Sequence, residues 1–207
     1  MIISVEGNIG ASKTTFLDVI QQALPDIDII QEPVDVWKNF EGHNVLQAYY
    51  DNPAKTSFMF QGLALLTRLE AQLRPQTANI RVVERSGLSD YCFAKNCFEA
   101  GLMTQMEFDV YCGWYRLASK IVPKVDMVIY LRTSPQVCHE RIKRRLRAEE
   151  TCIPMEYLEG LHRVHDERFL ATSVVIDRDQ DILGDEEAKK AMIAQVRLAI
   201  SRATSGV

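Results

Sequence analysis

The segment EGNIGASKTT, residues 6–15, has the residue types and spacing of a phosphate-binding loop. Gly7, Lys13 and Thr14 match the pattern G-x-x-x-x-G-K-[ST], in which main-chain N–H groups and a helix N-terminus hold phosphate oxygens. The lysine would add a cation beside the β- and γ-phosphates, and the threonine hydroxyl would contact Mg²⁺. We therefore predict that ATP is bound by Gly7, Asn8, Ile9, Gly10, Ala11, Ser12, Lys13, Thr14 and Thr15.

One residue of this loop departs from the pattern, because Ser12 stands where the second glycine is expected. Serine keeps the backbone N–H, so the set of donors is intact, but it adds a Cβ atom. If the position needs a positive φ, the strain costs about 1–2 kcal/mol; if it needs only close approach of the backbone, the cost is smaller. The pattern could also be a chance match in a helix-capping turn, but a predicted strand before it and a helix after it favour the nucleotide site.

Charged residues follow two further predicted strands. Glu32 could accept a proton from a hydroxyl that attacks the γ-phosphate, although alone it is more typical of an exposed loop glutamate. Glu84 and Arg85 stand at the end of another strand, where a carboxylate suits Mg²⁺ and an arginine suits a transferring phosphate; the alternative is a surface ion pair. Together with the loop, these residues favour a phosphoryl-transfer site.

A basic run, HERIKRRLRAEE, occupies residues 139–150. Arg141 and Arg145 lie four residues apart and share one helical face. A solvated helix face and a lid that brings arginines over a triphosphate explain the run equally well. Glu149 and Glu150 reverse the charge within one turn, which argues against a groove for nucleic acid.

The hydrophobic pattern predicts the elements that must position these residues. Short apolar strands alternate with segments of helical spacing, which indicates an α/β fold with a parallel sheet. Because ligands gather at the carboxyl ends of parallel strands, the candidate residues should meet there. No repeat or linker divides the sequence, so we expect one domain over residues 1–207. The predicted strands are 2–5, 26–30, 80–84, 125–134 and 173–177, and the predicted helices are 12–24, 44–75 with a break at Pro53, 88–100, 104–121, 134–150, 155–171 and 185–203.

Composition limits the class of protein. With 24 basic and 28 acidic residues, the net charge of −4 makes a general nucleic-acid or membrane-surface binder a poor fit. No apolar run is long enough to span a bilayer, and the strand at 2–5 leaves no room for a leader peptide. Five cysteines without C-x-x-C spacing disfavour zinc and disulfides, so we expect a reducing compartment, the cytoplasm. The spacing of His162 and His165 is more typical of surface histidines than of a metal site.

Stretches from Ile3 to about Leu170 resemble the deoxyribonucleoside kinase family, the group of deoxycytidine, deoxyguanosine and mitochondrial thymidine kinases. The resemblance is carried by EGNIGASKTT, EPVDVW, NVLQAYYDNP, SFMFQ, LLTRLEAQL, ERSGLSDYCFAKN, DMVIYLRTSPQVCHERI and EETCIPMEYLEGLH. It implies a P-loop kinase fold, with a five-stranded parallel sheet flanked by helices and a short arginine-rich lid at about 141–152. It also implies ATP with Mg²⁺ as phosphoryl donor, a deoxynucleoside as acceptor, and a homodimer.

The resemblance implies a role for individual positions. Glu32 matches the general base on the nucleoside 5′-hydroxyl, and Arg85 matches the arginine near that oxygen and the transferring phosphate. Tyr50 and Glu150 match the pair that holds the sugar 3′-hydroxyl, so nucleosides lacking it would be disfavoured. The other matches are Glu84 and Thr14 at Mg²⁺, Gln61 on the base edge, Phe60 and Phe93 on the base faces, Trp37 and Leu46 in the cleft wall, and Arg141, Arg145 and Arg147 around the phosphates.

Three positions bear on the preferred base. Ala64, Arg68 and Asp90 match a small-Arg-Asp set of the deoxycytidine and deoxyguanosine kinases, which thymidine-preferring members lack. The charged pair would remove room for a thymine methyl group and offer polar partners to an amino group. We therefore expect deoxycytidine or purine deoxynucleosides as substrates. Besides Ser12, Leu146 departs from relatives that have glycine there, and it would stiffen the lid.

Two other functions stay open. A kinase-like fold can serve as a structural subunit without catalysis, which Ser12 would suit, and one respiratory-complex subunit resembles this family. A nucleoside monophosphate kinase, such as a thymidylate kinase, shares the sheet and the loop, but Glu32 and Glu150 would repel an acceptor phosphate. For the homodimer, the segments of about 55–73 and 104–121 could supply an apolar face.

Overall fold

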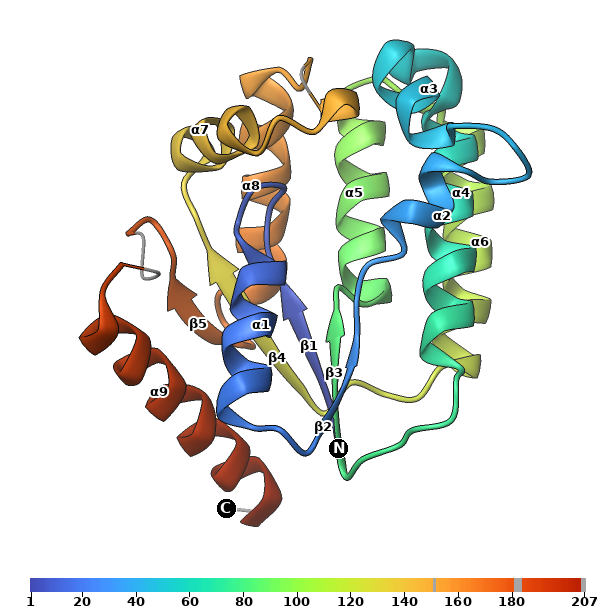
Figure 1. Ribbon diagram of the computed structural model, residues 1–207. Coiled ribbons are helices and arrows are strands. Elements are labelled where there is room, and N and C mark those ends of the chain that lie inside the picture. The colour runs from blue at the N-terminus through green and yellow to red at the C-terminus, as the bar shows by residue number, and fades with distance from the viewer. Residues whose placement is uncertain (151, 181–183, 206–207) are drawn as a thin grey trace.

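The computed structural model describes residues 1–150, 152–180 and 184–205, so Thr151 of the predicted lid lies outside the described residues. Its centre is a five-stranded sheet in the order β2-β3-β1-β4-β5, and every pairing is parallel (Figure 1). The predicted α/β class and five-stranded parallel sheet are confirmed. The strands are β1 (Ile2–Glu6), β2 (Ile27–Ile30), β3 (Ile80–Glu84), β4 (Met127–Arg132) and β5 (Val174–Asp177).

Helices connect the strands, and one of them was not expected from the sequence. Val34–Lys38 (α2) follows β2 and has only five residues, too few to show helical periodicity. The predicted break at Pro53 is confirmed, because Pro53 is the first residue of a new helix. The other helices are α1 (Lys13–Ala23), α3 (Val45–Asp51), α4 (Pro53–Gln72), α5 (Gly87–Glu99), α6 (Gln105–Ile121), α7 (Pro135–Arg145), α8 (Met155–Phe169) and α9 (Glu186–Ser205), with a 3₁₀ turn, η1, at Ala148–Glu150.

The basic helix is shorter than the predicted range 134–150. Leu146 adopts a left-handed conformation, with φ 51° and ψ 33°, and this ends α7 at Arg145. The chain then forms η1. The sequence gives no sign of this stop, because neither glycine nor proline marks it.

Alternating residues of β4 point to opposite faces of the sheet, and different helices cover the two faces. Ile129 and Leu131 lie in a buried cluster with Phe16 of α1 and Val196 of α9. Tyr130, between them, belongs to a different cluster with residues of α5 and α8. Since successive strand residues point to opposite faces, α1 and α9 cover one face of the sheet and α5 and α8 cover the other. Figure 1 shows α9 beside α1, and α4, α5 and α6 grouped away from them.

The strand order creates a crevice at the carboxyl ends of β1 and β3. The chain leaves these neighbours in opposite directions, since β1 leads through α1 to β2 while β3 leads through α5 and α6 to β4. Ligands bind at such points in open parallel sheets. The register pairs Val5 with Glu84, so the loop after β1 and the polar residues after β3 begin at the same level.

Helices α2 to α6 hold a second buried cluster beside the sheet, which includes Trp37, Leu46, Tyr49, Phe60 and Tyr111. This cluster forms one wall of the crevice and carries Phe60, one of the two aromatic residues predicted to bind the faces of a base. Across the described ranges, none of the helices has both the length and the apolar character needed to cross a bilayer.

Candidate active site

An open cavity of about 830 Å³ runs from the phosphate loop to the cluster of α2–α6. Residues from the strand ends, from α2 to α5 and from the lid therefore face one space. The predicted residues that line this cavity are Ile9, Gly10, Ser12, Lys13, Thr14, Thr15, Glu32, Trp37, Leu46, Tyr50, Phe60, Gln61, Ala64, Arg68, Glu84, Arg85, Asp90, Phe93, Arg141, Arg145, Arg147 and Glu150.

The loop depends on glycine at two points and tolerates serine at a third. A Cβ atom on Gly7 would lie 2.8 Å from the Leu131 carbonyl oxygen, and one on Gly10 would lie 2.5 Å from that of Cys138. Ser12 has φ 58° and ψ 38°, so its position does require the left-handed conformation. The sharp turn into α1 is thus kept with a non-glycine residue, at a strain of about 1–2 kcal/mol.

Gly7, Asn8 and Ala11, also predicted to bind ATP, are buried beneath the cavity rather than lining it. The Asn8 side chain donates to the Leu158 carbonyl oxygen at 2.9 Å and accepts from the Ile9 amide at 2.8 Å. It therefore ties the loop to α8. These three residues shape the loop, and their contact with a nucleotide would come from the backbone.

Lys13 is buried at the start of α1. Its Nζ donates to the carbonyl oxygens of Asn8, at 3.0 Å, and of Gly7, at 3.5 Å. Burial lowers the pKa of Lys13 to about 7, and the positive charge of Arg85 adds to the shift. An anion bound in the loop would supply the charge that those carbonyl oxygens do not.

Thr14 and Glu84 form an oxygen-rich pair at the mouth of the loop. The Thr14 hydroxyl is 3.1 Å from Oε1 and 3.2 Å from Oε2 of Glu84. Hydroxyl and carboxylate oxygens are ligands that Mg²⁺ accepts, usually together with phosphate oxygens and water. The donor set of these two residues therefore fits the predicted metal.

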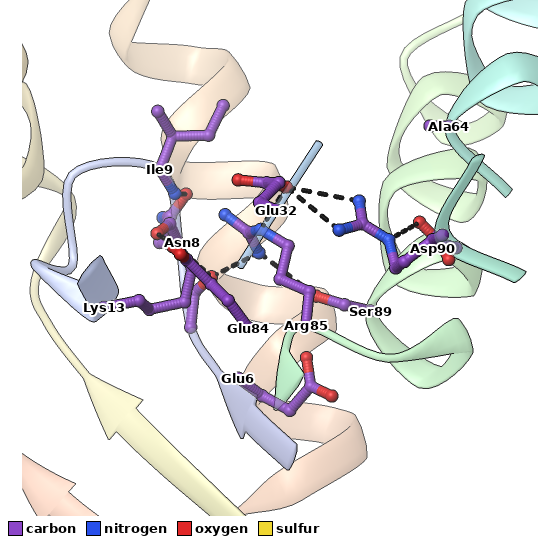
Figure 2. A network of polar contacts seen from close by, with 12 residues as sticks. Glu6, Asn8, Ile9, Lys13, Glu32, Ala64, Glu84, Arg85, Ser89 and Asp90 are labelled. Atoms are coloured by element: carbon purple, nitrogen blue, oxygen red, sulfur yellow. Dashed lines mark hydrogen bonds and ion pairs between the residues drawn. The ribbon is translucent and has the colours of Figure 1, made fainter. Parts of the chain in front are cut away.

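Glu32 lies between two buried arginines (Figure 2). Its Oε1 accepts hydrogen bonds from Nη1 and Nη2 of Arg68, both at 3.2 Å, and lies 3.0 Å from Nε of Arg85 in an ion pair. Burial pushes the pKa of Glu32 upward, but the charges of Arg85, Arg68 and Lys13 outweigh burial and hold that pKa well below its usual range. The carboxylate is therefore ionised at neutral pH.

Arg85 has an unusual backbone conformation for a non-glycine residue, with φ 62°. Its guanidinium lies over the Phe93 ring, with Cζ 4.6 Å from the ring centroid. Its Nη1 donates to the Gly7 carbonyl oxygen at 2.6 Å. The strained backbone thus turns the side chain back toward the phosphate loop, and such strain is concentrated at functional sites.

The aromatic cleft is packed around Phe60. Tyr49 stacks on Phe60 with centroids 4.6 Å apart, and Trp37 meets it edge-on at 5.4 Å. Gln61, predicted to bind the base edge, is buried, and its amide nitrogen donates to the Cys97 sulfur at 3.7 Å. The cleft thus presents stacked aromatic rings beside a buried amide, an arrangement that suits a planar polar ligand.

The predicted base-selecting pair is present and buried. Arg68 Nε donates to Asp90 Oδ1 at 2.8 Å. On α4, Arg68 lies one turn after Ala64. Burial raises the pKa of Asp90 to about 6, although Arg68 opposes the rise. The additional bond from Arg68 to Glu32 was not predicted from the sequence. One guanidinium therefore joins the base-selecting pair to the predicted proton acceptor.

The lid arginines are held by protein acceptors. Arg145 and Arg147 both form ion pairs with Glu150, the latter at 2.7 Å, and Arg141 donates to the Asp179 carbonyl oxygen at 3.3 Å. Glu150, predicted to bind the sugar with Tyr50, is thus bonded to the lid itself. Burial raises the pKa of the Tyr50 phenol, and the negative charge of Glu150 adds to this rise. The carboxylate is therefore close enough to affect Tyr50 electrostatically.

The model of the deoxynucleoside kinase family matches residues 3–201 of this sequence. The chain belongs to the deoxynucleoside kinase family. It is 37% identical to human mitochondrial thymidine kinase 2 over 175 residues, which cover 84% of this chain and 66% of the human protein. It is 33% identical to chicken deoxycytidine kinase 2, over 94% of this chain and 88% of that relative, and 37% identical to rat deoxycytidine kinase, over 79% and 73%. The matched region thus spans just under two thirds of the length of thymidine kinase 2 and a larger share of the length of the two deoxycytidine kinases.

Some of the residues around the site of this member of the deoxynucleoside kinase family were not predicted from the sequence. Tyr49 and Lys38 line the cavity, and Ser89 contacts Arg85. Ser89 could have been found, since it follows Arg85 by four residues at the start of a helix. The prediction of surface histidines was wrong for His165, which is fully buried. The partner of its Nε2 atom, Ser89, lies 76 residues away in sequence, beyond the reach of local spacing.

Proposed function

We propose that this chain, as one kinase domain, transfers the γ-phosphoryl group of ATP to the 5′-hydroxyl of a deoxyribonucleoside for nucleotide salvage. The observation that carries the proposal is an ionised Glu32 in the same cavity as the phosphate loop and the aromatic cleft. A nucleoside with its base in the cleft would bring its hydroxyl to this carboxylate. Catalysis of phosphoryl transfer consists mainly of such positioning and of charge stabilisation.

Each charged residue has a role in this proposal. Glu32 would accept the proton of the attacking hydroxyl, while Arg85 and Lys13 would stabilise charge on the transferring phosphoryl group. Arg141, Arg145 and Arg147 would move from their present acceptors to the phosphates as the lid closes. The last two would leave Glu150 and free this carboxylate for the sugar 3′-hydroxyl.

We propose Thr14 and Glu84 as the protein ligands of Mg²⁺, with Glu84 acting directly or through a water molecule. When bound with ATP, the ion supplies positive charge that bridges phosphate oxygens. The support is the chemistry of two adjacent oxygen donors beside Lys13.

For the base, we propose deoxycytidine and purine deoxynucleosides. The buried pair of Arg68 and Asp90 supports this choice, because it presents charged groups where a thymine methyl group would need space. The relatives include enzymes named for thymidine and for deoxycytidine, so the comparisons do not favour one base. The cytoplasm stays a prediction as well, since one relative is mitochondrial by name.

We also propose a homodimer formed through α4 and α6. Among the described residues, seven large apolar side chains on these two helices are exposed: Met59, Leu66, Met106, Val110, Trp114, Leu117 and Ile121. Exposed apolar patches of this kind mark interaction sites. A second copy of the chain would cover them.

The test is an acceptor panel with radiolabelled ATP and Mg²⁺. We expect label in deoxynucleosides, most of all in deoxycytidine or the purine deoxynucleosides, and little in the corresponding 5′-monophosphates. Transfer to monophosphates alone would identify a nucleoside monophosphate kinase. No transfer, together with no rise of the melting temperature in Mg·ATP or nucleoside, would favour a structural subunit.

A further inference from the structure

Arg85 is held on several sides at once. Its Nη1 donates to the Gly7 carbonyl oxygen at 2.6 Å and to Ser89 Oγ at 3.1 Å. Its Nε is paired with Glu32, and the ring of Phe93 lies under the guanidinium. Among the described residues, Nη2 has no hydrogen-bond partner, which makes it the nitrogen available to a phosphate oxygen.

Ser89 connects Arg85 to a helix behind the site. It is fully buried on α5, beside Arg85 (Figure 2). Because the Ser89 oxygen accepts from Arg85, its hydroxyl hydrogen is available to a second partner. Nε2 of His165 on α8 lies 3.4 Å from that oxygen.

The orientation of His165 fixes the direction of this contact. Its Nδ1 lies 2.8 Å from the Leu161 carbonyl oxygen. A carbonyl oxygen only accepts, so Nδ1 carries the proton and Nε2 presents a lone pair to Ser89. Burial lowers the pKa of His165 to about 3, and the charge of Arg85 adds to this effect, so the ring is neutral at physiological pH.

Aromatic rings hold His165 in place. The His165 ring meets Phe93 edge-on, with centroids 5.9 Å apart, and contacts Tyr130 and Phe169. Phe93 is also the ring beneath Arg85. The histidine and the arginine are therefore supported by the same side chain.

We propose that Ser89 and His165 are positioning residues, which aim Nη2 of Arg85 at the transferring phosphoryl group. We call the contacts Leu161–His165–Ser89–Arg85 the Arg85 relay. The inference rests on the proposed phosphoryl transfer and adds two buried residues that do not line the cavity. Without the relay, Nη1 keeps one acceptor instead of two, so the direction of the guanidinium is fixed less firmly by the contacts that remain.

A double-mutant cycle tests the relay. Ser89→Ala should lower kcat about 10-fold or more and leave the KM for nucleoside within about twofold, because a small misplacement affects the transition state most. In an Arg85→Lys background, Ser89→Ala should have no further effect. The control is Ser4→Ala, which removes a buried hydroxyl on β1 that has no hydrogen-bond partner within the part of the chain that the structure describes. An unchanged kcat, or the same loss in both backgrounds, would overturn the proposal.

Two substitutions of His165 provide a second test. Glutamine can place its amide near the position of Nε2 and accept from Ser89, whereas asparagine reaches only the position of Nδ1. We expect His165→Gln to keep most of the wild-type kcat and His165→Asn to lose as much as Ser89→Ala. Equal losses in these two variants, at equal melting temperature, would count against the relay.

Nuclear magnetic resonance tests the relay independently of activity. Because it is done on the wild-type protein, it applies even when a His165 variant does not fold. In the wild-type protein, two-bond ¹H–¹⁵N correlations should show a neutral His165 protonated at Nδ1 between about pH 6 and 8. A ring protonated at Nε2, or at both nitrogens, would overturn the relay. An inactive wild-type protein with the expected tautomer would refute the proposed function alone, whereas an active protein unaffected by Ser89→Ala would refute the relay alone.

Discussion

At the scale of single residues, the two cations nearest the loop differ in their partners. Arg85 is paired with the carboxylate of Glu32, whereas Lys13 contacts the carbonyl oxygens of Gly7 and Asn8. A buried ammonium group whose hydrogen bonds go to carbonyl oxygens rather than to a carboxylate favours its neutral form. Lys13 is therefore the residue whose protonation should respond most to an incoming anion.

We expect Mg·ATP to bind with uptake of roughly one proton at about pH 8. The pKa of Lys13 is about 7 in the free protein, and a bound triphosphate would raise it toward its ordinary value of 10.5. At about pH 6, below the pKa of Lys13 in the free protein, the lysine is already protonated, so the uptake should largely disappear. Calorimetry in buffers of different ionisation enthalpy measures it. Lys13→Arg, which stays charged, should show no uptake, and equal uptake by this variant would contradict the assignment.

Replacing Glu32 by glutamine should lower kcat by about 100-fold or more, because the amide does not take a proton. Glutamine keeps the size of the side chain and an oxygen that accepts from Arg68. Glu70→Gln, on the exposed side of α4, is the matched control. The assay follows label from ATP into deoxynucleosides, and undiminished turnover would refute Glu32 as the base.

At the scale of elements, two helix ends carry backbone strain. Ser12 precedes α1 and Leu146 follows α7, and both adopt positive φ. In the sequence, these are the two positions where glycine was expected, from the phosphate-loop pattern at Ser12 and from relatives at Leu146. Leu146 is 81% exposed, so its side chain contributes little packing, and the strain is the main effect of a substitution there.

Leu146→Gly should therefore stabilise the protein. Relief of strain is worth about 1–2 kcal/mol, whereas the added freedom of the unfolded chain costs about 0.5–1 kcal/mol, so the net gain is positive. For a protein of this size, we expect the melting temperature to rise by about 1–4 °C. Leu170→Gly, at an exposed leucine with φ −55°, should lower it instead. A loss of stability in both variants would show that Leu146 carries no strain.

The sequence predicted the sheet because each strand is a short apolar run between segments of helical spacing. It predicted that Glu32, Glu84 and Arg85 would lie close together, because each stands at or just after the carboxyl end of a strand in one parallel sheet. It did not predict α2, which is too short for periodicity, or the stop at Leu146. The bonds of Arg68 to Glu32 and of Ser89 to His165 depend on how helices pack, and residue spacing carries no information about that packing.

At the scale of the whole molecule, most of the exposed large apolar side chains of the described residues lie on α4 and α6. Figure 1 shows these two helices on the opposite side of the molecule from α9. Leu117 is 60% exposed, and Trp114 is 45% exposed while stacked on Phe58. Burial of this surface by a second copy would be favourable in proportion to its apolar area. Helix α4 also carries Phe60 and Arg68, so a dimer would support the wall of the cleft.

Leu117→Glu should therefore convert a dimer to a monomer, because a carboxylate would be buried against apolar side chains. Leu198→Glu, at a leucine of α9 that is 52% exposed, should leave the oligomeric state unchanged. Light scattering after gel filtration measures the mass of each variant. A monomeric wild-type protein, or the same mass for both variants, would rule out this interface.

Arg68 contacts Asp90 with one edge of its guanidinium and Glu32 with the other. A base that fits Asp90 poorly would shift the same group that steadies the proton acceptor. We therefore expect that a nucleoside with the wrong base still binds in the cleft but is phosphorylated more slowly. Such a molecule would occupy the pocket, remain unmodified, and act as a competitive inhibitor of the preferred one.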